Sequence, residues 1–199
     1  IKIKKIEKEP TVEQVAESFE ELIEENIEIE HFIDVNELVP SGSTTFNLEC
    51  SGYIDGAFKL GTMVNLIGDS SSGKSLLAFT VFAECNLLNR FNNYKFIYDD
   101  VEAANEFNLK KLFGAECAER IDQSERSRTI EEFNDSVARL IDEGEPFIYV
   151  LDSFDSLTSE AAVDKDVENR KKREKGNKTT GDYGDGKPKI FSRFCSLRI

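Results

Sequence analysis

Between residues 63 and 151, short apolar runs alternate with longer segments in which apolar residues recur at helical spacing. Strands are predicted for four of the runs: 63–67, 96–98, 121–124 and 147–151. Helices are predicted for three of the longer segments: 74–88, 103–113 and 130–143. Strands that alternate with helices in this way indicate an α/β domain, with a mainly parallel sheet that helices cover on both faces.

Signals at the helix ends support this pattern. Thr129 and Glu132 have the spacing of a capping box, and Gly144 stands where the helix that follows them would end. Gly114 has the same position after the preceding helix. These signals predict where two helices stop, independently of the apolar spacing.

The first 37 residues have the character of a separate acidic module. Helical spacing predicts an amphipathic helix over 11–25, and alternating isoleucines predict a half-buried strand that ends at Val35. Up to Val35 there are four lysines and eleven acidic residues. This charge is typical of a solvated helix face, and the alternative is a docking arm for a neighbouring subunit. We expect a division into 1–37 and 38–199, the second part beginning with a loop and short extended pieces.

Composition excludes several classes of protein. The chain has 199 residues and a formal net charge of -14, which excludes a uniformly basic nucleic-acid binder but not a local basic patch. Its apolar runs are far too short to span a bilayer, so no membrane partner is expected. The four cysteines lack C-x-x-C spacing, and the one histidine completes no common zinc set. We interpret the cysteines as reduced and expect a cytoplasmic protein.

The run at 63–67 leads into a segment with the pattern G-x-x-x-x-G-K-[ST], which then opens a predicted helix. This is the context of a P-loop, in which glycines let backbone N–H groups surround phosphate oxygens at a helix N-terminus. Lys74 would reach the outer phosphates, and the Ser75 hydroxyl would bind Mg²⁺. The predicted phosphate site consists of Gly68, Asp69, Ser70, Ser71, Ser72, Gly73, Lys74 and Ser75.

Acidic residues follow two of the predicted strands. Asp152 ends the last apolar run, where an α/β sheet presents its ligand groups, and it fits the Walker-B role of holding Mg²⁺. Asp99, Asp100 and Glu102 follow an earlier strand. We predict that Glu102 orients or deprotonates the water that attacks the γ-phosphate. The alternative is a solvated acidic turn that caps the next helix.

Residues 159–187 hold many charges and almost no large apolar side chains, which predicts a long mobile loop. Between Asp164 and Lys178 there are seven basic and four acidic residues. The segment either follows a nucleic-acid phosphate backbone or is simply a charged, disordered loop. A final helix is predicted from Pro188. The candidates for DNA binding are Arg170, Lys171, Lys172, Arg173, Lys175 and Lys178.

Together these segments resemble the RecA family of recombinases, and most closely its phage-encoded members. The resemblance rests on GTMVNLIGDSSSGKSLL at 61–77, YDDVEA at 98–103 and IYVLDSFDSLTS at 148–159. It covers roughly residues 38–199. The P-loop alone is shared by many ATPases, whereas the order P-loop, acidic turn, Asp-Ser and long polar segment is more specific.

The resemblance implies a P-loop NTPase of RecA type with ATP and Mg²⁺ as cofactors. By position, Glu102 would be the catalytic glutamate, Asp152 the Walker-B acid, and the segment from about 160 to 187 the first DNA-binding loop. Members of the family form ATP-bound filaments on single-stranded DNA and act in homologous recombination and DNA repair. The N-terminal helix and strand would match the family's oligomerisation element. We therefore expect a DNA-dependent ATPase that associates with itself.

Two features depart from the family pattern. The acidic turn contains an extra Asp, and the chain stops before the family's next core strand, which lies between the P-loop strand and the Walker-B strand. We therefore expect a fragment that folds poorly or hydrolyses ATP feebly, since the gap exposes unpaired backbone. Two other functions stay open: a small-molecule P-loop kinase, and a RecA-like accessory protein that binds nucleotide as a switch.

Overall fold

A parallel three-stranded sheet forms the centre of the protein in a computed structural model, which describes residues 33–175 and 187–198. The chain divides into two compact units, Ile1–Asp34 and Val35–Ile199, and the second contains the sheet. The strand order is β4 (Ile121–Asp122), β3 (Lys95–Asp100), β5 (Phe147–Asp152), and both pairs are parallel. The predicted α/β class with a parallel sheet is therefore confirmed.

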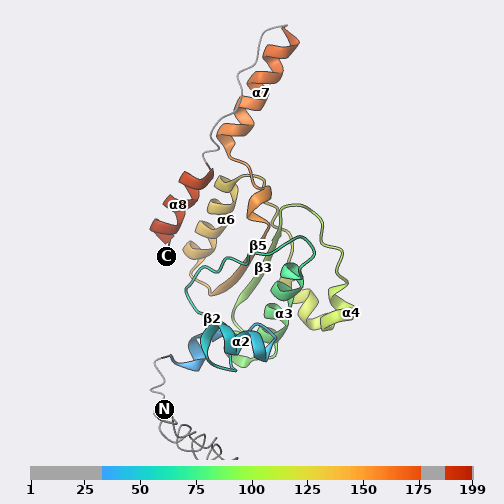
Figure 1. Cartoon of the computed structure of the whole chain (residues 1–199), viewed down its shortest axis with the longest axis vertical. Helices are drawn as coiled ribbons and strands as arrows, with labels where there is room; N and C mark the ends of the chain where they lie inside the picture. The colour runs from blue at the N-terminus through green and yellow to red at the C-terminus, as the bar shows by residue number, and fades with distance from the viewer. Residues whose placement is uncertain (1–32, 176–186, 199) are drawn as a thin grey trace, which may run out of the picture. The chain divides into compact units, whose positions relative to one another are not determined.

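Helix α3 (Lys74–Asn86) covers one face of the sheet (Figure 1). Its Phe79 stacks on Tyr98 with 4.3 Å between ring centroids, and its Phe82 stacks on Phe96 at 5.3 Å. All four rings are almost completely buried. The hydrophobic free energy of burying these aromatic side chains holds α3 against β3, and it fixes where the N-terminus of α3 lies relative to the strand tips.

Helices α6 (Ile130–Glu143) and α8 (Lys187–Arg198) lie on the opposite face (Figure 1). Phe133 of α6 packs edge-on against Tyr149, and Phe191 of α8 belongs to the same apolar cluster. Alternation along β5 produces the two faces, because Ile148 and Val150 pack toward the α3 cluster and their neighbours pack toward α6. The prediction of helices on both faces is confirmed.

Shorter elements connect these layers. Among them, Arg120 at the end of α5 donates to the carbonyl oxygens of Phe91 and Tyr94, which ties α5 to the loop before β3. The remaining elements are η1 (Val35–Glu37), β1 (Leu38–Val39), α2 (Thr44–Ser51), β2 (Phe58–Lys59), η2 (Asn89–Phe91), α4 (Leu109–Phe113), α5 (Ala115–Arg120), η3 (Phe154–Ser156) and α7 (Glu160–Glu174). Strands β1 and β2 pair with each other as a separate two-stranded antiparallel sheet, with α2 between them in the chain.

The strand predicted at 63–67 is wrong, since this segment is irregular backbone. Met63, Val64 and Ile67 are exposed, with 89% of the Ile67 surface accessible. Within the described ranges no strand pairs with the segment. A strand requires a neighbour for its backbone N–H and C=O groups, and apolar composition alone does not supply one.

The helix predicted at 103–113 is shorter in the structure, where only its last turn is formed as α4 (Leu109–Phe113). Ala103 has a left-handed backbone with φ of 56°, which a helix cannot contain. The Asp100 carboxylate accepts hydrogen bonds from the backbone N–H of Ala104 (3.1 Å) and Asn105 (3.0 Å). A side chain that binds the backbone in this way competes with helical hydrogen bonds and stabilises a turn instead.

The mobile loop predicted over 159–187 is also wrong for most of its described length, which forms helix α7. Ser159 caps the helix by accepting from Ala162 N–H, and basic residues occupy the last turn, where the helix dipole favours them. No residue of α7 is buried. Its helicity therefore comes from capping, dipole and helix-forming side chains, which an apolar periodicity does not detect.

Helix α2 likewise lies where the sequence predicted a loop with extended pieces. Ser43 caps its N-terminus, and Gly52, with φ of 79°, ends it in the left-handed region. The predicted helix at 11–25 and most of the predicted strand after it lie outside the described residues. The end of that strand prediction is wrong, because Val35 begins the 3-10 turn η1.

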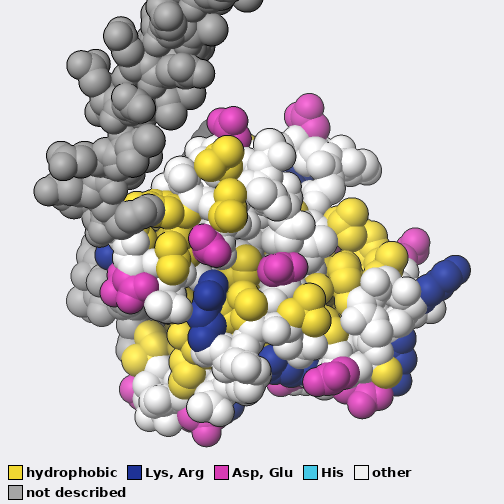
Figure 2. All heavy atoms as spheres, turned by 90° about the horizontal axis from the view of Figure 1, so that it is seen from below, with side chains coloured by type: hydrophobic (Ala, Val, Ile, Leu, Met, Phe, Trp, Pro, Cys, Tyr) yellow, Lys and Arg dark blue, Asp and Glu magenta, His cyan; other side chains and the backbone are white. Residues whose placement is uncertain are grey.

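The surface of the described protein mixes apolar and charged groups. Leu48 and Ile54 are among the large apolar side chains that are more than half exposed. On the face drawn in Figure 2, apolar side chains are interspersed with acidic and basic ones. No helix in the described residues combines the length and the apolar character that crossing a bilayer requires.

Candidate functional site

The segment Gly68–Gly73 forms a tight loop that leads directly into α3. Gly73 has φ of 92°, a left-handed conformation that favours glycine, and Ser71 also lies in this region with φ of 61°. A Cβ atom on Gly68 would lie 2.8 Å from Ser72 Oγ, so a larger residue would require the Ser72 side chain to move. Lys74 folds back over the loop, and its Nζ donates to the carbonyl oxygens of Gly68 (2.9 Å) and Asp69 (2.8 Å).

The N-terminus of α3 differs from those of three other helices, because no side chain in the described residues accepts a hydrogen bond from its first backbone N–H groups. Side chains of Ser43, Thr129 and Ser159 cap α2, α6 and α7, whereas no side chain caps α3 at Gly73. The first N–H groups of an α-helix have no partner within the helix and carry partial positive charge. An uncapped N-terminus after a glycine-rich loop can therefore bind an anion such as a phosphate.

Ser75, in the first turn of α3, contacts the end of β5. Its Oγ donates to Asp152 Oδ2 across 2.5 Å, and the two residues are 77 positions apart in the chain. Tyr98 Oη, from the neighbouring strand β3, donates to the same oxygen across 2.6 Å. The packing of α3 on the sheet thus brings the Ser75 hydroxyl and the strand-end carboxylate of Asp152 together, as the sequence predicted.

The oxygen atoms of Ser75 and Asp152 fit Mg²⁺ better than they fit a metal ion whose ligands are all supplied by the protein. Hydroxyl and carboxylate oxygens are hard donors, and Mg²⁺ in nucleotide sites takes few protein ligands, the rest being phosphate oxygens and water. Within residues 33–175 and 187–198, no three His, Cys, Asp or Glu side chains lie close enough to hold a metal ion. The donor set is consistent with an ion shared with a bound phosphate.

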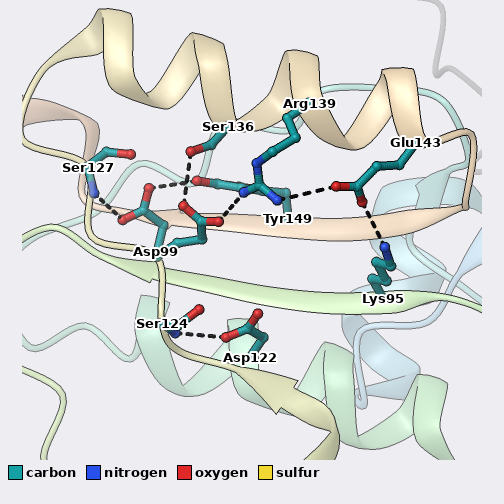
Figure 3. A network of polar contacts seen from close by, with 10 residues as sticks. Lys95, Asp99, Asp122, Ser124, Ser127, Ser136, Arg139, Glu143 and Tyr149 are labelled. Carbon is teal, nitrogen blue, oxygen red and sulfur yellow. Dashed lines mark hydrogen bonds and ion pairs between the residues drawn. The ribbon is translucent and has the colours of Figure 1, made fainter.

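The three acidic residues at the end of β3 and just after it have different surroundings. Asp99 is completely buried and accepts from Ser127 N–H (2.9 Å) and Tyr149 Oη (2.7 Å), on the α6 side of the sheet (Figure 3). Asp100 holds the following turn through two backbone N–H groups. Both carboxylates are therefore engaged in stabilising the fold.

Glu102 is the third acid, and its side chain is exposed. Its Oε1 accepts hydrogen bonds from two hydroxyls that follow β5, Ser153 Oγ at 3.2 Å and Ser156 Oγ. The peptide bond between Asp152 and Ser153 is cis. The two hydroxyl contacts hold Glu102 beside the end of the strand that carries Asp152.

A cavity of about 100 Å³ joins these groups. Ser75 and Asp152 line it, together with Asp100 at the end of β3 and Glu102 two residues further along the chain. A hydroxyl, the carboxylate at the end of β5 and a second, exposed carboxylate thus border one space. The complete lining is Ser75, Tyr98, Asp100, Glu102, Ala104, Asn105, Phe107 and Asp152.

Sequence reasoning did not identify Tyr98 as a member of this site. Burial, followed by the contact with Asp152, raises the pKa of the Tyr98 hydroxyl well above its usual value, so the phenol stays protonated as a donor. Phe96, two residues before Tyr98 in β3, packs in the same apolar cluster. The sequence pattern is therefore that of two core aromatic residues. The polar end of Tyr98 and its place just before the acidic turn were the available signals.

The predicted DNA-binding residues lie apart from the cavity. Arg170, Lys171, Lys172 and Arg173 occupy the last turns of α7, and Lys175 is the residue at its C-terminal cap. None of these five lines the cavity. Lys172 forms an ion pair with Glu168 at 3.5 Å. Lys178 lies outside the described residues.

Comparisons with known proteins add no relatives to this description. A scan against protein-family models found no matching family, and a search of curated proteins found no match.

Proposed function

We propose that this protein is a P-loop nucleoside triphosphatase of RecA type that binds ATP with Mg²⁺ and hydrolyses it. The observation that carries the proposal is the hydrogen bond of 2.5 Å between Ser75 Oγ and Asp152 Oδ2. In P-loop NTPases, the P-loop Ser or Thr and the Walker-B Asp hold Mg²⁺ together.

The residues around the cavity have distinct roles in this proposal. The N–H groups of the loop and of the first turn of α3 bind the phosphates, and Lys74 exchanges its carbonyl contacts for the outer phosphate oxygens. Ser75 and Asp152 hold Mg²⁺, which neutralises charge on the phosphates. Glu102 orients the attacking water and accepts its proton. Asp99 and Asp100 are less suited to this task, because both oxygens of each carboxylate already accept hydrogen bonds within the fold, whereas the two hydroxyls that contact Glu102 bind only its Oε1.

We further propose that the ATPase acts with single-stranded DNA in homologous recombination and associates into filaments. Support comes from the resemblance of the motifs and from α7, which carries four consecutive basic residues just before its last residue and has no buried residue. A row of lysines and arginines can follow a phosphate backbone even on a chain with a net charge of -14. The η3 turn joins this helix to Asp152, so the two regions are adjacent in the chain.

The first experiment measures binding of a fluorescent ATP analogue with and without Mg²⁺, which does not require efficient turnover. We expect Lys74→Ala to weaken binding by about tenfold or more, because a charged donor to the phosphates is removed. Lys110→Ala is the matched control, since Lys110 is an exposed lysine paired with Glu119 on α5. Equal affinity of the unchanged protein and the Lys74 variant would contradict the phosphate site.

The second experiment measures ATP turnover with and without single-stranded DNA. We expect DNA to stimulate hydrolysis. Binding of nucleotide without turnover under either condition would favour the nucleotide switch. Phosphate transfer to a small molecule, without an effect of DNA, would favour the kinase.

A further inference from the structure

Tyr98 lies at the proposed site, but the roles proposed above for the P-loop and the acidic residues do not include it. Its ring is 2% exposed and stacks on Phe79, while its hydroxyl reaches the lining of the cavity. A buried phenol needs a hydrogen-bond partner. Its partner here is the carboxylate of Asp152, at 2.6 Å, although the stacking of the ring would be the same in a phenylalanine.

Two donors from different elements meet on one oxygen of Asp152. Ser75 Oγ comes from α3 and Tyr98 Oη comes from β3, and both donate to Oδ2. In the part of the chain that the structure describes, Oδ1 accepts no hydrogen bond. Two bonds from two directions restrict rotation of the carboxylate, and they leave Oδ1 available to another ligand.

We propose that Tyr98 is a positioning residue whose hydroxyl orients the Asp152 carboxylate for Mg²⁺. The inference rests on the proposed function and adds to it a residue that belongs to neither motif. Tyr98→Phe keeps the stacking ring and removes only the O–H group. Without that donor the carboxylate rotates more freely, so part of the metal affinity is spent on ordering it when Mg²⁺ binds. The loop N–H groups and Lys74 are unchanged, so nucleotide affinity without metal stays the same.

Tyr149 provides a matched control in the same sheet. Its Oη also donates to a carboxylate, Asp99 Oδ2, at 2.7 Å, and Asp99 lies outside the cavity lining (Figure 3). Tyr149→Phe therefore removes the same kind of bond from the fold without touching the site. Any effect on stability alone is common to the two variants, whereas an effect on metal binding separates them.

The test titrates MgCl₂ into each protein in the presence of a fluorescent ATP analogue, with thermal unfolding of the nucleotide-free proteins measured in parallel. We expect the half-saturating Mg²⁺ concentration to rise about tenfold in Tyr98→Phe, the size of one hydrogen bond to a charged group. We expect no rise in Tyr149→Phe, and unchanged metal-free nucleotide affinity in both.

Three results would overturn the inference or its basis. If Tyr98→Phe requires the same Mg²⁺ concentration as the unchanged protein, Tyr98 has no positioning role while the proposed function stands. An equal rise in Tyr149→Phe would assign the effect to loosening of the fold. If the unchanged protein binds no nucleotide, or binds it without any dependence on Mg²⁺, the proposed function fails and the role of Tyr98 fails with it.

Discussion

Ser156 donates a hydrogen bond to Glu102 across 54 positions of the chain, and it does so from the turn between β5 and α7. The proposed water-orienting carboxylate is therefore in contact with the segment that leads to the basic helix. Ser153, next to Asp152, donates to the same Glu102 oxygen at 3.2 Å. The contact explains how an exposed acid at a turn is kept at the edge of the cavity.

Replacement of Glu102 by Gln should separate binding from hydrolysis. The amide keeps the size of the side chain and can still accept from Ser156, but it cannot take a proton from water. We expect nucleotide affinity to be retained and turnover to fall by about 100-fold or more, the usual contribution of a positioned base. Steady-state turnover and binding of a fluorescent ATP analogue measure the two effects. Loss of binding in this variant would show that the role given to Glu102 is wrong.

Asp100→Asn provides the contrast to that variant. Asp100 accepts from two backbone N–H groups, so its replacement should loosen the turn over Ala104 and Asn105. We expect a lower melting temperature, with turnover reduced much less than in Glu102→Gln. Thermal unfolding and turnover measured on both variants check this order. The reverse order would identify Asp100 as the base.

Simultaneous replacement of Arg170, Lys171, Lys172 and Arg173 by Ala should weaken binding of single-stranded DNA. Alanine favours helix, so α7 should persist, and circular dichroism can verify it. We expect the slope of log affinity against log salt to become shallower by about 0.7 for each DNA phosphate that the variant no longer neutralises. Charge-neutral changes at the exposed Val163 and Val167 on the same helix serve as controls. An unchanged salt slope would remove α7 from the DNA site.

Sequence patterns correctly predicted the elements in which capping signals and buried apolar side chains indicate the same structure. In α6 the capping box at Thr129 and the buried side chains of Ile130, Phe133 and Val137 point to the same helix, and the structure confirms it. Strand β5 was predicted from one apolar run between Gly144 and Asp152, because a run this short favours a buried strand over a helix. The meeting of Ser75 with Asp152 was predicted too, since parallel strands and helices have a fixed polarity.

Other features depend on contacts that a sequence does not display. Whether the run at 63–67 is a strand depends on a neighbouring strand, and none of the described strands pairs with it. The left-handed backbone of Ala103 stands where a helix was predicted to begin, and no glycine signals it. Tyr98 was not predicted as a site residue, because its apolar ring fits the pattern of a core residue and the sequence does not show that its hydroxyl donates to Asp152. The choice of Glu102 over its neighbours stays a prediction, which the different surroundings of Asp99 and Asp100 support.

Removal of the capping box should destabilise the protein by a modest and measurable amount. Thr129 Oγ1 accepts from Glu132 N–H at 3.2 Å, and Glu132 reaches back to the N–H of Thr129. We expect Thr129→Ala to lower the free energy of unfolding by about 1 kcal/mol, equivalent to roughly 2–4 °C in melting temperature. Thr62, whose exposed hydroxyl donates to the Lys59 carbonyl oxygen, is the control. A decrease no larger than in Thr62→Ala would mean that the cap contributes nothing.

Stability should decrease in alkaline solution, and buried Cys85 should account for part of the decrease. Burial raises the pKa of the Cys85 thiol from 9.0 to about 12, and the side chain is 0% exposed. Between these values the unfolded chain loses the proton while the folded chain keeps it, so the unfolded state binds fewer protons and the free energy of unfolding falls as pH rises. This contribution is complete below pH 9 and is lost between about pH 9 and 12, at up to about 1.4 kcal/mol per pH unit.

Cys85→Ala isolates that contribution. The variant loses packing in the apolar cluster between α3 and the sheet. That loss is the same at every pH, so by itself it lowers the free energy of unfolding by a constant amount. We expect the free energy of unfolding, measured by urea titration from about pH 8 to 10.5, to fall less steeply above pH 9 than in the unchanged protein. Cys50, which is exposed, is the control, since Cys50→Ala should leave the slope as it is. Parallel curves for the Cys85 variant and the unchanged protein would show that this thiol does not couple folding to pH. Other groups whose pKa values burial raises, Cys117, Tyr98 and Tyr149, would then account for the alkaline decrease.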